Sequence, residues 1–90
     1  MITYTKHAMT RMNQRGITKE MINLTIEYGM CSNDKIILGT KIIKKLLNKV
    51  ASDLKSKLLK ILDKGGVTVV LGEDASVITV YNCNRLKLYI

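Results

Sequence analysis

The sequence predicts a single α+β domain over residues 1–90, in which two N-terminal helices and a basic helical middle pack on a small antiparallel sheet. Apolar residues recur at spacings of one, three and four through the first two thirds of the chain, as in amphipathic helices. β-branched runs dominate the last third. Helices followed by strands are typical of the α+β class, and 90 residues leave room for one hydrophobic core.

The first two elements are predicted to be short helices joined by a tight turn. Thr5 caps a helix that reaches to residue 15, and Gly16 ends it. Thr18 caps a second helix, which ends at Tyr28 and Gly29. Ile17 stands just before this second cap, where it can pack over the first turn. The turn residues therefore predict a helical hairpin.

The middle of the chain begins with an ambiguous segment. Residues 30–38 contain a turn signal, Ser32-Asn33-Asp34, followed by a short apolar run, so a strand and a loop entering a strand are both open. From Thr40 the pattern is helical, and Ser52 is placed to cap a second helical stretch that ends at Gly65-Gly66. Eight lysines and only two acids lie between residues 41 and 64.

The final third predicts an antiparallel sheet. Residues 67–71 and 76–81 are β-branched runs separated by residues 72–75, which is typical of a β-hairpin. Residues 85–90 alternate between polar and apolar types and predict a third strand. That strand would carry three residues on one face: Arg85, Lys87 and Tyr89.

Composition limits the classes of function. Fifteen Lys and Arg against seven Asp and Glu give a net charge of +8, which favours phosphate-containing partners and excludes an acidic mimic of nucleic acid. Four Tyr, with no Phe or Trp, disfavour a binder that stacks bases on aromatic rings. No signal peptide or membrane-spanning run is apparent, so we expect a cytoplasmic protein.

The two cysteines do not suggest a metal site. Cys31, Cys83 and the single histidine cannot supply four ligands with a zinc-binding spacing, so no metal or other cofactor is expected. In a reducing compartment the two thiols are expected to be buried and inert, and a disulfide between them is the alternative.

The first predicted helix carries the chemically most informative residues. His7, Arg11, Gln14 and Arg15 fall within about a quarter-turn of one another on a 3.6-residue repeat. An imidazole can exchange a proton near neutral pH, and fixed guanidiniums can stabilise the charge of a phosphorane. Cleavage of RNA without a metal ion would need groups of these two kinds. The alternative is a histidine that hydrogen-bonds locally beside two solvated arginines.

These residues form part of a longer pattern. It comprises His7-Ala8, Arg11-Met12, Gln14-Arg15-Gly16-Ile17, Tyr28-Gly29, Val69-Val70, Asp74 and Val77-Ile78-Thr79-Val80. In this pattern the chain resembles a family of bacterial and phage domains of unknown function, number four-two-five-eight, which is grouped with the RelE-like ribonuclease toxins. The resemblance covers about residues 5 to 81, although the middle matches in character only.

The resemblance implies a RelE-like fold and a metal-independent endoribonuclease, in which the ribose 2′-hydroxyl attacks the adjacent phosphodiester. The catalytic residues it implies are His7, Arg11, Arg15 and Thr79. Many relatives carry a Gly-His-Arg after the last matched strand, whereas this chain has Tyr81-Asn82-Cys83-Asn84-Arg85. The second histidine is missing and the arginine is displaced by two residues. Either the proton-transfer role of the missing histidine passes to Tyr81, Tyr89 or a lysine, or the activity has been lost.

The lysines of the middle segment also have two interpretations. They flank an apolar stripe, as expected of a solvated amphipathic helix, and they could equally hold the backbone of a nucleic acid without reading its sequence. A membrane surface is the least favoured partner. The candidate nucleic-acid-binding residues are Lys41, Lys44, Lys45, Lys49, Lys57, Lys60, Arg85 and Lys87.

Two functional hypotheses follow. The first is a RelE-like endoribonuclease, either a toxin or a phage or plasmid relative of one, with RNA as its substrate and an acidic antitoxin as a possible protein partner. The second is a catalytically silent phage or plasmid binding protein or inhibitor, which acts on a nucleic acid or a nucleoprotein complex. Oligomeric state is left open by the sequence.

Overall fold

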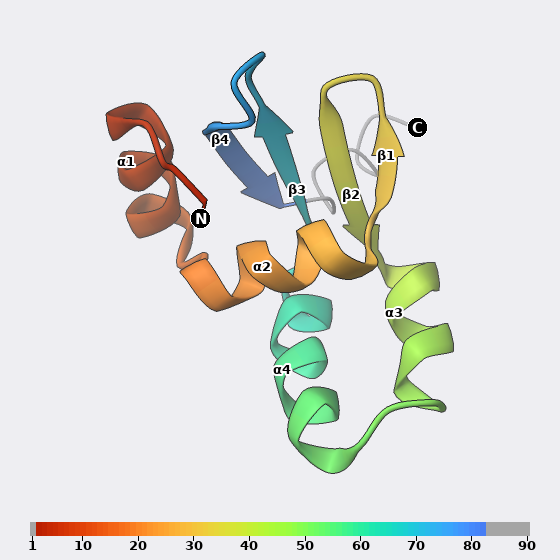
Figure 1. Cartoon of the computed structure of the whole chain (residues 1–90). Coiled ribbons are helices and arrows are strands. Elements are labelled where there is room, and N and C mark those ends of the chain that lie inside the picture. Colours follow the sequence, from red (N-terminus) through yellow and green to blue (C-terminus); the bar gives the residue numbers. More distant parts are fainter. Residues whose placement is uncertain (1, 83–90) are drawn as a thin grey trace.

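The computed structural model describes residues 2–82, which form four helices and a four-stranded antiparallel sheet (Figure 1). The predicted α+β class is therefore confirmed. In chain order the elements are α1 (Lys6–Arg15), α2 (Lys19–Tyr28), β1 (Met30–Ser32), β2 (Lys35–Gly39), α3 (Thr40–Leu47), α4 (Ser52–Asp63), β3 (Gly66–Leu71) and β4 (Val77–Asn82).

The sheet has the order β1-β2-β3-β4, and each neighbouring pair is antiparallel. The ambiguous segment is a hairpin, in which Ser32 pairs with Lys35 around a turn and Asn33 adopts a left-handed φ of 57°. The predicted hairpin of β3 and β4 is confirmed, with a register shift next to Leu71. The predicted strand over residues 85–90 lies outside the described residues.

The caps of the helical hairpin agree with the prediction. The Thr5 hydroxyl accepts a hydrogen bond from the backbone N–H of Ala8, and Gly16 ends α1 in the left-handed conformation. Thr18 caps α2 in the same way.

The prediction that Ser52 caps the next helix, α4, is wrong. Extended Ala51 occupies the cap position of α4 and has no side-chain oxygen to accept a bond, so Ser52 is the first helical residue.

The core lies between the helices and one face of the sheet. In β3, Val67 and Val69 are fully buried, and their side chains share one face because strand residues alternate. Ile22 of α2 and Ile61 of α4 are also fully buried. α1 runs beside β4, α2 crosses β2 and β3, and the pair α3 and α4 extends beyond one end of the sheet (Figure 1).

Residues 2–82 contain no helix with the length and apolar character needed to cross a bilayer. The longest helix, α4, has 12 residues, whereas a span needs about 20.

Candidate functional site

The N-terminal end of α1 is fastened to the start of β4. The Thr5 N–H donates to the Val77 carbonyl over 3.0 Å, and the Val77 N–H donates to the Thr3 carbonyl over 2.8 Å. The Thr5 hydroxyl also donates to the Ile78 carbonyl over 3.1 Å while it caps its own helix. One threonine therefore both starts α1 and attaches it to the sheet.

The C-terminal end of α1 is fastened to the end of α4. The Lys64 ammonium donates to the Arg15 carbonyl over 3.0 Å. Its positive charge lies where the helix dipole is negative, which is stabilising. The Asn82 side-chain amide donates in turn to the Lys64 carbonyl over 3.4 Å, so the ends of α1, α4 and β4 are joined. Sequence reasoning did not single out Lys64 or Asn82 for this role, because no local pattern reports a contact across 49 residues.

Between these two attachments, α1 presents the predicted stripe of polar residues. His7 and Gln14 are exposed, whereas Arg11 is half-buried and its guanidinium reaches the Gln14 side-chain carbonyl over 3.5 Å. Arg15 is half-buried and its Nε atom is fully buried. The adjacent face of α1 packs into the core through Ala8. The helix therefore holds one imidazole and two guanidiniums on a backbone fixed at both ends.

Thr79 lies beside the start of this helix. It pairs with Val70, and its neighbour Val80 is fully buried in the core, so Thr79 belongs to the opposite sheet face. The bond between Thr5 and Ile78 brings the backbone around His7 close to the backbone around Thr79. The Thr79 side chain itself lies on the sheet face opposite the core onto which α1 packs. Tyr81 follows on the same face of β4 and is half-buried.

The lysines of α3 do not form one surface with this stripe. α3 contacts α4 and β2, and it lies across the molecule from α1 (Figure 1). Lys57 points from α4 toward α2, where it forms an ion pair of 3.0 Å with Glu20. The other described candidates are exposed: Lys41, Lys44, Lys45, Lys49 and Lys60. Arg85 and Lys87 lie outside the described residues.

The expectation of a buried thiol is wrong for Cys31. This residue is exposed, as are both of its neighbours in β1, because β1 is the outer strand of the sheet and the helices do not cover it. Cys83 lies outside the described residues, and the alternative of a disulfide stays untested. The described part of the chain contains no group of three or more His, Cys, Asp and Glu residues able to hold a metal ion.

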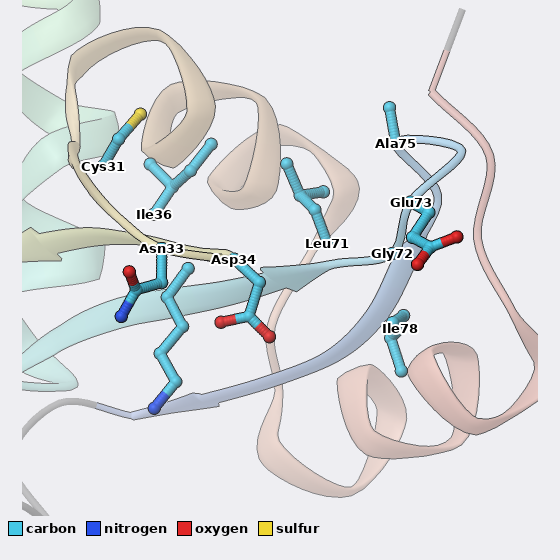
Figure 2. Close-up of a pocket in the computed structure, with 10 residues that line it drawn as sticks. Cys31, Asn33, Asp34, Ile36, Leu71, Gly72, Glu73, Ala75 and Ile78 are labelled. Carbon is cyan, nitrogen blue, oxygen red and sulfur yellow. The ribbon is translucent and has the colours of Figure 1, made fainter.

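Cys31 lines an open cavity of about 560 Å³ between the turns of the two hairpins (Figure 2). Asp34 and Glu73 contribute carboxylates, and the backbone joins the turns through a 2.8 Å bond from the Leu71 N–H to the Asp34 carbonyl. In the turn between β3 and β4, the backbone N–H of Ser76 donates a hydrogen bond to the Asp74 carboxylate, which lowers the pKa of that carboxyl. Lys35 also lines the cavity, but the two carboxylates outnumber its one ammonium group. Net negative charge repels phosphate, so this cavity is a poor candidate for holding RNA.

One known family of domains matches nearly the whole of this architecture. The family model described as "Domain of unknown function (DUF4258)" matches residues 4–82, from the residue before the Thr5 cap to the end of β4. Neither a curated protein nor a solved structure is significantly similar to the chain. Because the match covers nearly all of the sequence, the chain belongs to the DUF4258 family of domains of unknown function.

Proposed function

We propose that this protein is a RelE-like, toxin-type endoribonuclease that cleaves RNA without a metal ion. The observation that carries the proposal is the arrangement of α1. The helix holds His7, Arg11 and Arg15 along one side, and hydrogen bonds fix both of its ends to the rest of the domain. Rigid placement matters because charged groups stabilise a transition state best when they need not reorganise during the reaction.

In the proposed reaction, His7 accepts the proton of the ribose 2′-hydroxyl. The 2′-oxygen then forms a bond to the adjacent phosphorus, and the bond from phosphorus to the 5′-oxygen breaks, which leaves a 2′,3′-cyclic phosphate. Arg11 and Arg15 stabilise the negative charge of the phosphorane, for which the planar guanidinium is well suited. The Thr79 hydroxyl donates a hydrogen bond to a phosphate oxygen.

The departing 5′-oxygen needs a proton, and His7 is the only histidine of the chain. Tyr81 is the candidate donor, since it follows Thr79 on the same face of β4. Tyr4 is less suitable because burial raises the pKa of its phenol, so it releases its proton less readily. Lys64 already donates to the Arg15 carbonyl, and we assign it a positioning role.

The experiment is an RNA cleavage assay in the presence of EDTA, with structured and unstructured substrates. We expect products that end in a 2′,3′-cyclic phosphate, and no cleavage at a linkage whose 2′-hydroxyl has been replaced by hydrogen. His7→Ala should reduce the rate by a factor of about 10²–10⁴, the usual contribution of a general base. Arg11→Ala should cost about 10²–10³.

Asn23→Ala is the control, because Asn23 is an exposed, uncharged residue of α2 and belongs neither to α1 nor to the candidate nucleic-acid-binding residues. Its cleavage rate should stay near that of the wild type. Equal activity of the His7 variant would disprove the role of His7. A complete lack of cleavage across substrates would disprove the nuclease.

A second candidate function is supported by the single imidazole of the sequence. With one histidine and many exposed lysines, the domain could act as a catalytically silent binder of a nucleic acid or a nucleoprotein complex. If about six lysines neutralise phosphates, affinity should fall roughly a thousandfold between 50 and 200 mM salt. His7→Ala would leave that affinity unchanged, which separates this function from the nuclease.

A further inference from the structure

The two edges of the sheet differ in how far the described residues cover them. At β4, residues 3–5 and α1 cover the outer edge, through the backbone bonds that join Thr5 and Thr3 to Val77. At the other edge, β1 (Met30–Ser32) pairs only with β2 among the described residues, and all three of its residues are exposed. An exposed edge strand is a template for pairing with another chain.

A groove of about 530 Å³ lies next to β1, between the sheet and the first turn of α3. Met30, Ile37 and Ile42 supply its apolar lining, and Met30 is 64% exposed. Gly39 leaves room in the groove, since a Cβ atom added there would meet nothing within 4 Å. An apolar side chain of a partner could therefore be buried here, which stabilises a complex by removing apolar surface from water.

The one charged residue among the described residues that line the groove is positive. Lys41 lines it, and the first turn of α3 carries no acidic residue. Lys35 pairs with Ser32 and lies on the same sheet face as Ile37, because strand residues alternate. Neither Asp34, in the turn of the same hairpin, nor Asp63, two residues before Gly65, is among the described residues that line the groove. In a partner protein, carboxylates on either side of an apolar side chain would complement the positive charge of these lysines.

The side chains that line the groove favour a peptide over a nucleic acid as its ligand. Among the described residues no aromatic ring lines the groove, so these residues offer no platform on which bases could stack. Aliphatic side chains beside an open strand edge are instead suited to an extended peptide, which gains affinity from backbone hydrogen bonds and specificity from pockets for alternate side chains.

We propose that β1 and this groove bind an extended acidic segment of a partner protein. The segment adds a strand beside β1, buries an apolar side chain against Met30, Ile37 and Ile42, and directs its carboxylates toward Lys35 and Lys41. This inference concerns the opposite edge of the sheet from α1, and it does not depend on nuclease activity.

The test uses the full chain and a fluorescein-labelled peptide of sequence Glu-Glu-Ile-Thr-Ile-Glu-Glu, whose alternate residues place two Ile and two Glu on one face. Fluorescence polarisation should show saturable binding. Met30→Asp and Lys41→Glu should each weaken it at least tenfold. Met9→Asp is the matched control, because Met9 is 52% exposed on α1 and does not line the groove. It should leave the affinity unchanged.

Two further measurements do not rely on a variant that might be destabilised. Pro in place of the central Thr of the peptide should abolish binding, because Pro disrupts strand pairing. Nuclear magnetic resonance of the wild-type chain should show that the peptide shifts the amide signals of Met30–Ser32 and Gly39.

Several outcomes would overturn the proposal. These are equal binding of a peptide with Lys in place of Glu, unchanged binding by Met30→Asp, and unshifted amide signals in β1. An RNA oligonucleotide that shifts the same amides at lower concentration would assign the groove to nucleic acid. Contacts of the groove with a second copy of the chain, or with residues 83–90, would assign it to the protein itself.

Discussion

Thr5 performs two tasks, and replacing it with Val tests the attachment of α1 to the sheet. Val keeps the shape of the side chain and removes the hydroxyl. The Ala8 N–H then loses its cap, a bond of 3.1 Å, and the Ile78 carbonyl loses a donor at the same distance. Loss of an N-cap costs about 1 kcal/mol. Loss of a partly solvated hydrogen bond adds about 0.5 kcal/mol.

Thr5→Val should therefore lower the free energy of unfolding by about 1.5 kcal/mol. For a domain of this size, that loss lowers Tm by roughly 6–12 °C. The assay is urea and thermal unfolding followed by circular dichroism. A shift of the urea midpoint at an unchanged m value reports a change in stability, whereas a changed m value would report a change in the denatured state.

Thr10→Val is the matched control. Thr10 is exposed within α1, and its hydroxyl donates only to the Lys6 carbonyl of the same helix. Its removal should change the free energy of unfolding by less than about 0.5 kcal/mol. If Thr5→Val destabilises the domain no more than Thr10→Val does, the hydroxyl of Thr5 does not anchor α1, and the reasoning about a helix fixed at both ends is wrong.

Three further predictions test the core, a turn and a charged group. Leu58→Ala, at a fully buried position of α4, should cost about 2–5 kcal/mol by urea unfolding; a smaller loss would mean that the site is less tightly packed than the structure shows. Gly16→Ala should cost roughly 1–2 kcal/mol, because Gly16 has a φ of 64° and its added Cβ would lie 3.1 Å from the Lys64 ammonium; an unchanged Tm would contradict the left-handed turn. The hydrogen bond from Ser76 lowers the pKa of Asp74 in the folded state, so this carboxylate contributes stability above its ordinary pKa, and the contribution is lost as the pH falls through the lower, folded value. Asp74→Ala should therefore be less stable than the wild type at pH 7, and the difference should shrink toward pH 2; a constant difference would exclude this linkage.

The helical hairpin could be predicted because its determinants are local. The capping bonds of Thr5, Gly16 and Thr18 involve backbone groups within four residues, so these bonds depend little on the rest of the fold. The stripe of His7, Arg11 and Gln14 follows in the same way from helical periodicity. The β3–β4 hairpin was equally visible, since a short turn joins two β-branched runs.

Other features could not be predicted because they depend on partners far along the chain. β1 has three exposed residues and no burial pattern of its own, and it forms a strand because β2 is held by β3. The exposure of Cys31 follows from that position at the edge. The side of α4 on which Lys57 lies follows from the burial of Leu58 and Ile61, which turns Lys57 toward Glu20 of α2.

By itself, the sequence determined the helix caps, the period of each segment, the excess of positive charge and the stripe of residues on α1. Only the tertiary structure decided that Lys64 holds the end of this helix and that the described lysines are divided between different surfaces. It also decided that, within residues 2–82, one sheet edge is covered while the other is open. The physical reason is separation along the chain. Thr5 and Ile78 are 73 residues apart and Lys64 and Arg15 are 49 apart, so only the packed core brings these groups within hydrogen-bonding distance.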